Sequence, residues 1–322
     1  MSSTTRESVD AGHERDVVRG RLYGVSHALR SGLSELWLDK AGLLGLTVIV
    51  LIIACAVFAP WLAPHEPSEQ SLLNRLTPPF QSWDHPLGTD GVGKDELSQL
   101  LYGARTSLVV GGAVVLLSGT FGIVLGLFAG YRGGRWDSTV MRVVDVQVAF
   151  PGLLLALTIL TVVPPSLKSV IVVLALNGWM VYARMTRGIV LQARETPYVE
   201  AAEIVGCKPR RVIFKHILPH LASPLLTLAV LEFAGIVVAE AALSFLGLGI
   251  QPPEVSWGLM VASGREYLFT AWWVATWPGI AISVLVLAVN LFASWLRVAA
   301  DPQQRDRRFA QTSRLTQTTE TR

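Results

Sequence analysis

The first candidate for chemistry in this sequence is a glycine-rich run, GTDGVGKD, at residues 88–95. It nearly matches the phosphate-binding pattern GxxxxGK followed by Ser or Thr, in which backbone amides and a lysine hold phosphate oxygens. Asp95 stands where that pattern needs a hydroxyl to bind magnesium, and no strand-like pattern precedes the run. We therefore predict a turn-rich external segment here and not a nucleotide site.

The second candidate is a histidine pair, His216 and His220, at the i, i+4 spacing of zinc-binding helices. The glutamate of an HExxH motif is missing, and Pro219 would bend a helix between the two rings. Cys55 and Cys207 show no metal-ligand spacing. The Ser, Thr and Cys residues form no nucleophile–base set. The sequence thus predicts no catalytic residue, no metal site and no cofactor bound by this chain.

The third candidate is a pair of carboxylates, Glu232 and Glu240, which lie eight residues apart in an apolar run. A carboxylate within a membrane is costly and usually faces protein or water. Two interpretations follow: a proton or cation relay, or hydrogen-bonded packing residues near a helix end. Packing fits Glu240 well, whereas both interpretations stay open for Glu232.

The elements that must position these residues are apolar helices. The chain of 322 residues is 51% hydrophobic and only 16% charged, and its mean hydropathy is +0.47. About 20 apolar residues cross a bilayer as a helix. We therefore expect an all-α polytopic membrane protein with six transmembrane helices. The spans are Ala41–Leu62, Ser107–Gly130, Val140–Val163, Ser169–Thr186, Pro224–Leu246 and Pro278–Leu296.

The basic residues predict the orientation of these spans. Of the 27 Lys and Arg residues, 22 fall in segments that share one side if the N-terminus is inside, and five fall in the alternate segments. Basic residues stay on the cytoplasmic side, so both termini are expected inside. This asymmetry explains the pI of about 9.0 without nucleic acid as a partner.

The same division predicts the domain organisation. A cytoplasmic arm, 1–40, carries an amphipathic helix with Leu22, Val25, Leu29, Leu33 and Leu36 at helical spacing. The first span, 41–62, is expected to be retained; cleavage near Cys55 is the alternative, but the forty-residue lead is too long for a signal. There follow an external loop, 63–106, a five-helix core, 107–299, with a cytoplasmic loop at 188–222, and a cytoplasmic tail, 300–322.

Two residue clusters within the spans have simple structural interpretations. Gly122, Gly126 and Gly130 recur every fourth residue, which lets another helix approach closely. Helix packing is favoured over pore lining for this stripe. Tryptophans also gather near the outer face, where interfacial anchoring is expected and docking of a partner protein is the alternative. These tryptophans are Trp257, Trp272, Trp273 and Trp277.

The most informative segment is the loop between the fourth and fifth spans, from Glu195 to Leu225. Thr196 is predicted to cap a short helix, and Gly206 to end that helix with a left-handed turn. A second helix is expected to carry Arg210 and Arg211 and to stop at Pro219. Two short helices joined by a sharp turn would form a rigid protrusion whose small residues fit a partner's groove.

This loop resembles the EAA loop of bacterial ABC-importer permeases, which docks as a coupling helix on a cytoplasmic ATPase. The matching residues are Glu200, Ala201, Ala202, Gly206, Leu218 and Pro219. His216 stands where the pattern has Ile, with Ile217 beside it. Further segments resemble the second ("C") subunit of dipeptide, oligopeptide and nickel permeases. They are HPLGTDGVGKDELSQLLYGARTSL, RGGRWD, AFP, AEAALSFLGLGIQPP, SWG and the DP after the last span.

The resemblance implies a type I ABC-importer permease core in a bacterial plasma membrane, with peptides as cargo. The implied partners are a second homologous permease subunit, two ATPase subunits (or one fused) that carry ATP and Mg, an extracytoplasmic binding protein and membrane lipid. Nickel or another small solute is the alternative cargo. A rival function is a proton-coupled secondary transporter that uses Glu232 and Glu240, and a third is a membrane enzyme.

Overall fold

The computed structural model describes residues 39–300, and this part of the chain is built from helices. The predicted amphipathic helix of the N-terminal arm and the tail beyond residue 300 lie outside the described residues. The α-helices are α2 Lys40–Val57, α3 Ala59–Leu62, α4 Glu96–Arg132, α5 Gly134–Val148, α6 Gly152–Val162, α7 Leu167–Arg194, α8 Pro197–Ile204, α9 Pro209–Val212, α10 Leu218–Phe245, α11 Trp257–Gly264 and α12 Trp273–Ala300. Shorter elements are the 3-10 turns η1 Leu72–Asn74 and η3 Arg265–Tyr267 and the π-helical turn η2 Ile213–Ile217.

Five helical stretches of the described chain are long and apolar enough to cross a membrane, and a sixth span results if α5 and α6 are taken together. Many of their large side chains face outward; Leu51 is 62% and Leu116 70% exposed. Apolar side chains on the outside as well as the inside are expected where lipid replaces water. The prediction of an all-α polytopic membrane protein is confirmed.

The third expected span, Val140–Val163, is not one helix. Its two halves, α5 and α6, are bent by 85° at the break between them. Pro151 lies at this break and precedes the first residue of α6. Since a proline cannot donate to the helical ladder and disfavours a helical residue before it, the chain turns there. Hydropathy alone could not detect this bend.

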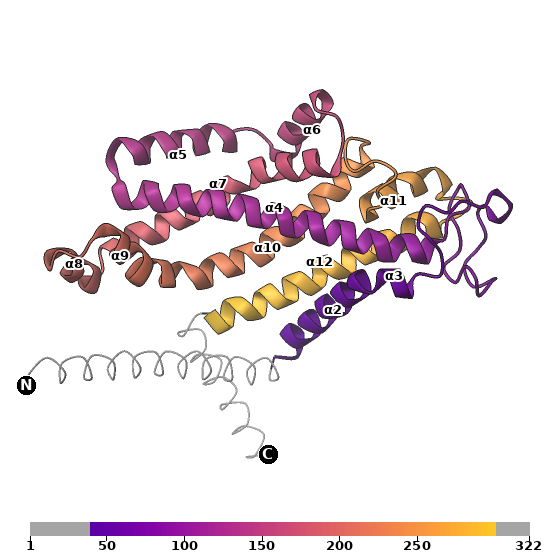
Figure 1. Cartoon of the computed structure of the whole chain (residues 1–322), viewed down its shortest axis with the longest axis horizontal. Coiled ribbons are helices and arrows are strands. Elements are labelled where there is room, and N and C mark those ends of the chain that lie inside the picture. Colours follow the sequence, from indigo (N-terminus) through magenta and orange to yellow (C-terminus); the bar gives the residue numbers. More distant parts are fainter. Residues whose placement is uncertain (1–38, 301–322) are drawn as a thin grey trace, which may run out of the picture.

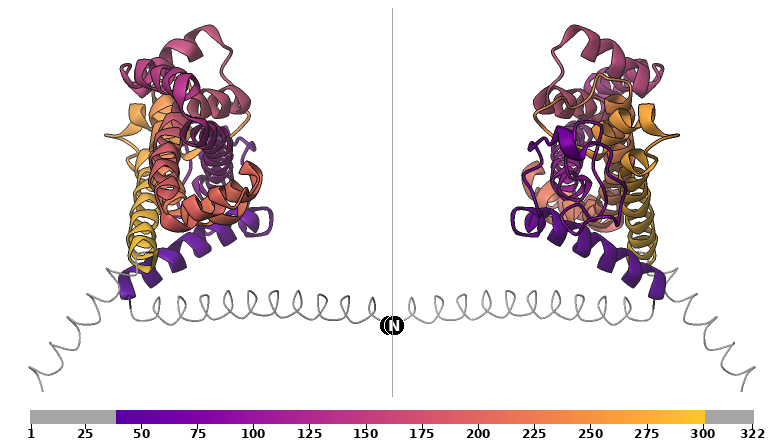
Figure 2. Two further views of the ribbon diagram at one scale, coloured as in Figure 1. Left: turned by 90° about the vertical axis from the view of Figure 1, so that its left-hand side faces the viewer. Right: turned by 90° about the vertical axis from the view of Figure 1, so that its right-hand side faces the viewer.

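Four long helices, α4, α7, α10 and α12, run along the length of the molecule (Figure 1). The α8 and α9 helices lie at one end, and α11 lies with the segment before α4 towards the other end. Seen end-on, α2 runs along one edge of the bundle and α5–α6 along the opposite edge (Figure 2). Helix α2 packs on α12 through glycine, because a Cβ on Gly45 would lie 2.5 Å from the Ala288 carbonyl oxygen.

The segment between the first two spans is shorter than expected, because α4 begins at Glu96 and not at Ser107. Asp95 caps this helix by accepting a hydrogen bond from the Ser98 amide at 2.8 Å. The remaining residues, 63–95, form an irregular layer at one end of the bundle, which we call the external segment. It is fastened to α12 by Trp273, whose indole N–H donates to the Thr89 carbonyl at 3.1 Å.

Candidate functional site

The loop between α7 and α10 is a compact helical unit, which we call the α8–η2 segment (Pro197–Ile217). Helix α8 begins at Pro197, where the missing N–H of proline costs nothing. Gly206 has φ +83°, the left-handed conformation predicted for it. The Cys207 amide donates to the Ala202 carbonyl at 3.0 Å, which completes the hydrogen bonding of the helix end. The sharp turn therefore follows directly from the glycine.

Buried side chains hold the α8–η2 segment against the main bundle. Val199, Val212 and Ile217 are each 0% exposed and share one apolar cluster with Val190 of α7 and Leu221 of α10. A hydrogen bond of 2.8 Å joins the Tyr198 hydroxyl to the His220 ring, and so ties α8 to α10. Because packed cores deform little, the segment is expected to move with α7 and α10 as one body.

The tip of the α8–η2 segment presents apolar side chains to the surroundings. Ile204 is 80%, Val205 83% and Phe214 69% exposed. Exposed apolar groups of this kind mark contact surfaces for another protein or for a membrane. The predicted docking residues Glu200, Ala201, Arg210 and Arg211 are also exposed, whereas Ala202 is half-buried.

The second half of this segment differs from the expectation that Pro219 ends a helix. Pro219 lies in the first turn of α10, and the backbone remains helical from Pro209 to Phe245 through the π-helical turn η2. A proline inside a continuous helix removes one backbone hydrogen bond, and the π-helical turn η2 lies just before this position. Ile217 is buried and Leu218 half-buried, so these two residues help to anchor the segment against the bundle.

The glycine stripe of α4 lies against α7. Gly122, Gly126 and Gly130 are all buried, and a Cβ on Gly126 would lie 2.5 Å from the Ala183 carbonyl oxygen. A Cβ on Gly130 would lie 2.9 Å from the Val190 Cβ. The two backbones therefore approach as closely as they do only because these positions lack side chains, which is the packing arrangement described for small residues in membranes.

The two intramembrane carboxylates lie in different environments on α10. Glu240 is 1% exposed, and its Oε1 accepts hydrogen bonds from the hydroxyls of Ser244 at 2.8 Å and Ser256 at 2.9 Å. It thereby links α10 to the first residue before α11. Glu232 is half-buried. The geometry of Glu240 suits a packing role, and the role of Glu232 stays open.

Comparison with known proteins places the chain in a family. The model of the binding-protein-dependent transport system inner membrane component matches residues 122–306, which include the whole α8–η2 segment. The chain belongs to this family of membrane transport components. A second model, the N-terminal transmembrane domain of oligopeptide transport permease C, matches residues 33–79. The permease is thus a multi-pass inner-membrane protein of a transport family, without catalytic activity in this chain.

Individual relatives resemble the permease over most of its length. The di/tripeptide transport system permease protein DppC of Pseudomonas aeruginosa is 42% identical over 283 residues, which are 85% of this chain and 93% of the relative. The dipeptide transport system permease protein DppC of Escherichia coli is 42% identical over 84% of this chain and 93% of its own. A solved structure of the MetNI methionine ABC transporter, in an inward-facing conformation, resembles the fold with a TM-score of 0.52 at 19% identity. It covers 62% of this chain and 96% of its own.

Ion pairs that the sequence did not predict attach helix α5 of the permease to α7. Arg187 holds Asp137 with two hydrogen bonds, one of them 2.7 Å from the Nη2 of Arg187 to the Oδ2 of Asp137. Arg184 binds Asp145 at 2.8 Å. The partners lie 50 and 39 residues apart, so no local spacing could have indicated them. Asp145, which lies within the expected span Val140–Val163, is therefore paired.

Two of the tryptophans that were expected as interfacial anchors are instead buried inside the permease. Trp257 is 2% and Trp273 5% exposed. The Trp257 indole donates to the Leu100 carbonyl at 2.9 Å, as Trp273 does to Thr89. These two side chains therefore link elements inside the protein, because a buried indole N–H needs a hydrogen-bond acceptor. Trp272 is 50% exposed and fits the expected interfacial position.

The glycine-rich run of the permease has its backbone amides already occupied. Asp90 Oδ1 accepts hydrogen bonds from the amides of Val92 at 2.9 Å and Lys94 at 2.8 Å. Amides that point inward in such a turn are the groups that a phosphate would need. The carboxylate of Asp90 thus fills the place of an anion, and the structure shows the turn-rich segment that the sequence predicted.

Proposed function

We propose that this permease is one of two transmembrane subunits of an ABC importer that carries dipeptides and oligopeptides into the cell. The relatives that cover most of the chain are peptide permeases, and the family model at residues 33–79 describes an oligopeptide permease of the C type. The other wall of the pathway is a second, homologous permease subunit. An extracytoplasmic binding protein delivers the peptide.

The energy for transport comes from outside this chain. Two cytoplasmic ATPase subunits, or one fused subunit, bind ATP and Mg and change their separation as ATP is bound and hydrolysed. The α8–η2 segment docks in a groove of the ATPase. Glu200, Ala201 and Gly206 shape the small-residue side of the contact, and the exposed Arg210 and Arg211 face acidic groups of the partner or lipid headgroups.

The observation that carries this proposal is the combination of a rigid base and an exposed apolar tip. The base is fixed because Val199, Val212 and Ile217 are fully buried against α7 and α10. The tip exposes Ile204 and Val205. Since the chain is helical without interruption from Pro209 to Phe245, a displacement of the tip moves a whole transmembrane helix. Such a rigid connection transmits coupling free energy, which a flexible link would lose.

The proposal is tested by transport in liposomes that contain the complete assembly. We expect uptake of a radiolabelled dipeptide that requires ATP and the binding protein and continues after the proton gradient is collapsed. Uptake by this chain alone, driven by a proton gradient without ATP, would instead establish a secondary transporter that uses Glu232 and Glu240.

The docking surface is tested by Val205→Asp, which places a charge on the exposed tip. Because a charge in an apolar contact costs about 2 kcal/mol or more, we expect at least a tenfold loss of ATP-driven uptake and of ATPase co-purification. The matched control is Leu73→Asp in the external segment, where the side chain is 99% exposed. Co-purification of the ATPase should be unchanged in this control. Normal ATPase binding by the Val205→Asp variant would show that the tip is not part of the interface.

A further inference from the structure

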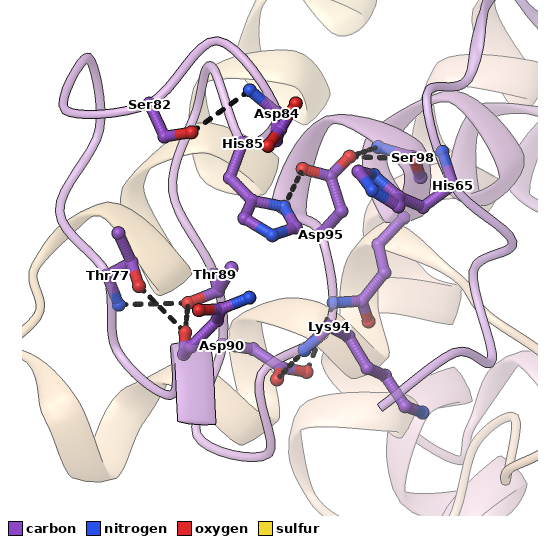
Figure 3. Close-up of polar contacts among 12 residues, drawn as sticks. His65, Thr77, Ser82, Asp84, His85, Thr89, Asp90, Lys94, Asp95 and Ser98 are labelled. Carbon is purple, nitrogen blue, oxygen red and sulfur yellow. Dashed lines mark hydrogen bonds and ion pairs between the residues drawn. The ribbon is translucent and has the colours of Figure 1, made fainter. Parts of the chain in front are cut away.

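Three potential metal ligands from separate parts of the chain meet in the external segment. His65 follows α3, His85 lies in the middle of the segment, and Asp95 precedes α4. One ligand atom of each residue lies within 4.8 Å of the others, an arrangement found once among the described residues. The three residues are 20 and 10 positions apart, so the sequence contained no metal-binding pattern. Figure 3 shows them converging beside Ser98.

The distances within this cluster suit ligands that share one ion. His85 Nδ1 and Asp95 Oδ1 are 3.1 Å apart, and the rings of His65 and His85 stack with centroids 4.8 Å apart. Two atoms bound about 2.0–2.2 Å from one tetrahedral ion lie about 3.3–3.6 Å apart. The three ligand atoms lie within 4.8 Å of one another, so side-chain rotations that bring them closer together would let them share one ion.

An unsatisfied nitrogen gives independent support. The Nδ1 of His65 is buried and has no hydrogen-bond partner in the protein. A buried polar atom without a partner is costly and uncommon in folded proteins. A metal ion between the three side chains would bind this nitrogen and remove the cost.

A second set of contacts orients the ligands. The amide and the hydroxyl of Ser98 donate to Asp95 Oδ2 at 2.8 and 2.7 Å, which leaves Oδ1 directed at His85. The backbone amide of His65 donates to the same Ser98 hydroxyl at 3.1 Å. Natural metal sites show such outer contacts, which fix the orientation of the ligating side chains. Asp95 is 2% and His85 8% exposed, so the site is sheltered.

We propose that the external segment binds a divalent transition-metal ion through His65, His85 and Asp95, with Zn²⁺ as the fitting ion. Two imidazoles and one carboxylate form the ligand set of zinc and its neighbours, whereas magnesium and calcium prefer oxygen ligands alone. The ion would fasten the end of the first span to the start of α4. This site replaces the expectation of a chain without metal, and it does not depend on the proposed transport function.

The test uses the full chain, purified in detergent with a tag that contains no histidine, stripped of metal and titrated with Zn²⁺. We expect one tightly bound equivalent, and slower proteolysis of residues 63–95 when Zn²⁺ is present. Co²⁺ in place of Zn²⁺ should give visible absorption bands from the ligand field. Absence of a bound equivalent in the wild-type chain would leave only a His85–Asp95 hydrogen bond and overturn the proposal.

Variants identify the ligands. His65→Gln and His85→Gln should each weaken Zn²⁺ binding at least about 100-fold, and Ser98→Ala about tenfold as an orienting contact. The matched control is the double variant His216→Gln/His220→Gln on the other side of the membrane, where binding should be unchanged. Thermal unfolding without metal checks that each variant is folded. Unaltered Zn²⁺ affinity in a folded His65→Gln/His85→Gln double variant would exclude this site.

Discussion

At the scale of single residues, Glu240 shows how a carboxylate is accommodated in an apolar helix. Its Oε1 accepts from Ser244 and Ser256, and the same two hydroxyls accept from the amides of Ile250 and Leu259 at 3.2 Å. The carboxylate thus fixes hydroxyls that in turn satisfy the backbone where α10 ends and α11 begins. Its removal would affect several hydrogen bonds at once.

Replacement of Glu240 separates this packing role from a charge-dependent one. Glu240→Gln keeps an acceptor oxygen, so we expect a loss of less than about 1 kcal/mol in the free energy of unfolding. Glu240→Leu leaves two buried hydroxyls without their acceptor and should cost about 2–3 kcal/mol. Chemical denaturation of the purified chain in detergent measures both. Glu232→Leu, at the half-buried carboxylate of the same helix, serves as control; equal losses at both positions would contradict the special role of Glu240.

Single residues were predictable from sequence where the cause was local. The left-handed conformation of Gly206 follows from the residue type and the end of a short helix. The hydrogen bond between His85 and Asp95 could not be predicted, because it depends on how the external segment folds over α4. Pro219 was misinterpreted because a proline can lie within a continuous helical stretch, here just after a π-helical turn that the sequence does not reveal.

At the scale of elements, the contact between α4 and α7 depends on the glycine stripe. Without a hydrophobic effect between helices in lipid, their association relies on close van der Waals contact. The Cβ of an alanine at position 126 would lie 2.5 Å from the Ala183 carbonyl oxygen and 2.8 Å from the Thr186 Cβ. Backbone atoms cannot rotate away as side chains can, so one methyl group would separate the helices.

Two alanine substitutions on the same helix test this contact. Gly126→Ala should lower the free energy of unfolding in detergent by about 1–3 kcal/mol through overpacking. Gly112→Ala is the matched control, because nothing lies within 4 Å of its Cβ position. This change should be neutral or stabilise α4 by up to about 1 kcal/mol, because glycine is a poor helix former. A Gly126→Ala chain as stable as wild type would show that α4 and α7 do not rely on this approach.

The spans were predictable from sequence because each contains a long apolar stretch, which composition alone reveals. Their ends and bends were not. Helix α4 extends to Glu96, eleven residues before the expected apolar run, because Asp95 caps it by accepting from the Ser98 amide. The 85° bend before α6 lies at Pro151, and the preceding helix α5 is held to α7 by Asp137 and Asp145.

At the scale of the whole molecule, the two functional ends lie at opposite extremes of the bundle (Figure 1). The external segment with its proposed metal ligands is at one end, and the α8–η2 segment is at the other. The distribution of basic residues predicts that the end with α8 faces the cytoplasm. Orientation and function are therefore linked, since only this end can meet an ATPase inside the cell.

Cysteine labelling tests the orientation. In a background with Cys55→Ser and Cys207→Ser, we introduce Leu73→Cys, 99% exposed in the external segment, or Val205→Cys, 83% exposed in the α8–η2 segment. A membrane-impermeant maleimide should label Leu73→Cys in spheroplasts and Val205→Cys only after permeabilisation. The reverse labelling pattern would show that the molecule has the opposite orientation in the membrane, with the α8–η2 segment outside the cell and out of reach of ATP.

The length of α4 has a mechanical consequence. Its 37 residues extend about 55 Å at 1.5 Å per residue, whereas the hydrocarbon core of a bilayer is about 30 Å thick. Helix α4 thus runs without a break from the region beside His85 to the contact of Gly130 with α7. A tilt of about 10° around its midpoint would displace each tip by about 5 Å. Helix α4 therefore connects the external segment directly with the end of the bundle that carries α8, so that a change of its tilt at one end would displace the other end as well.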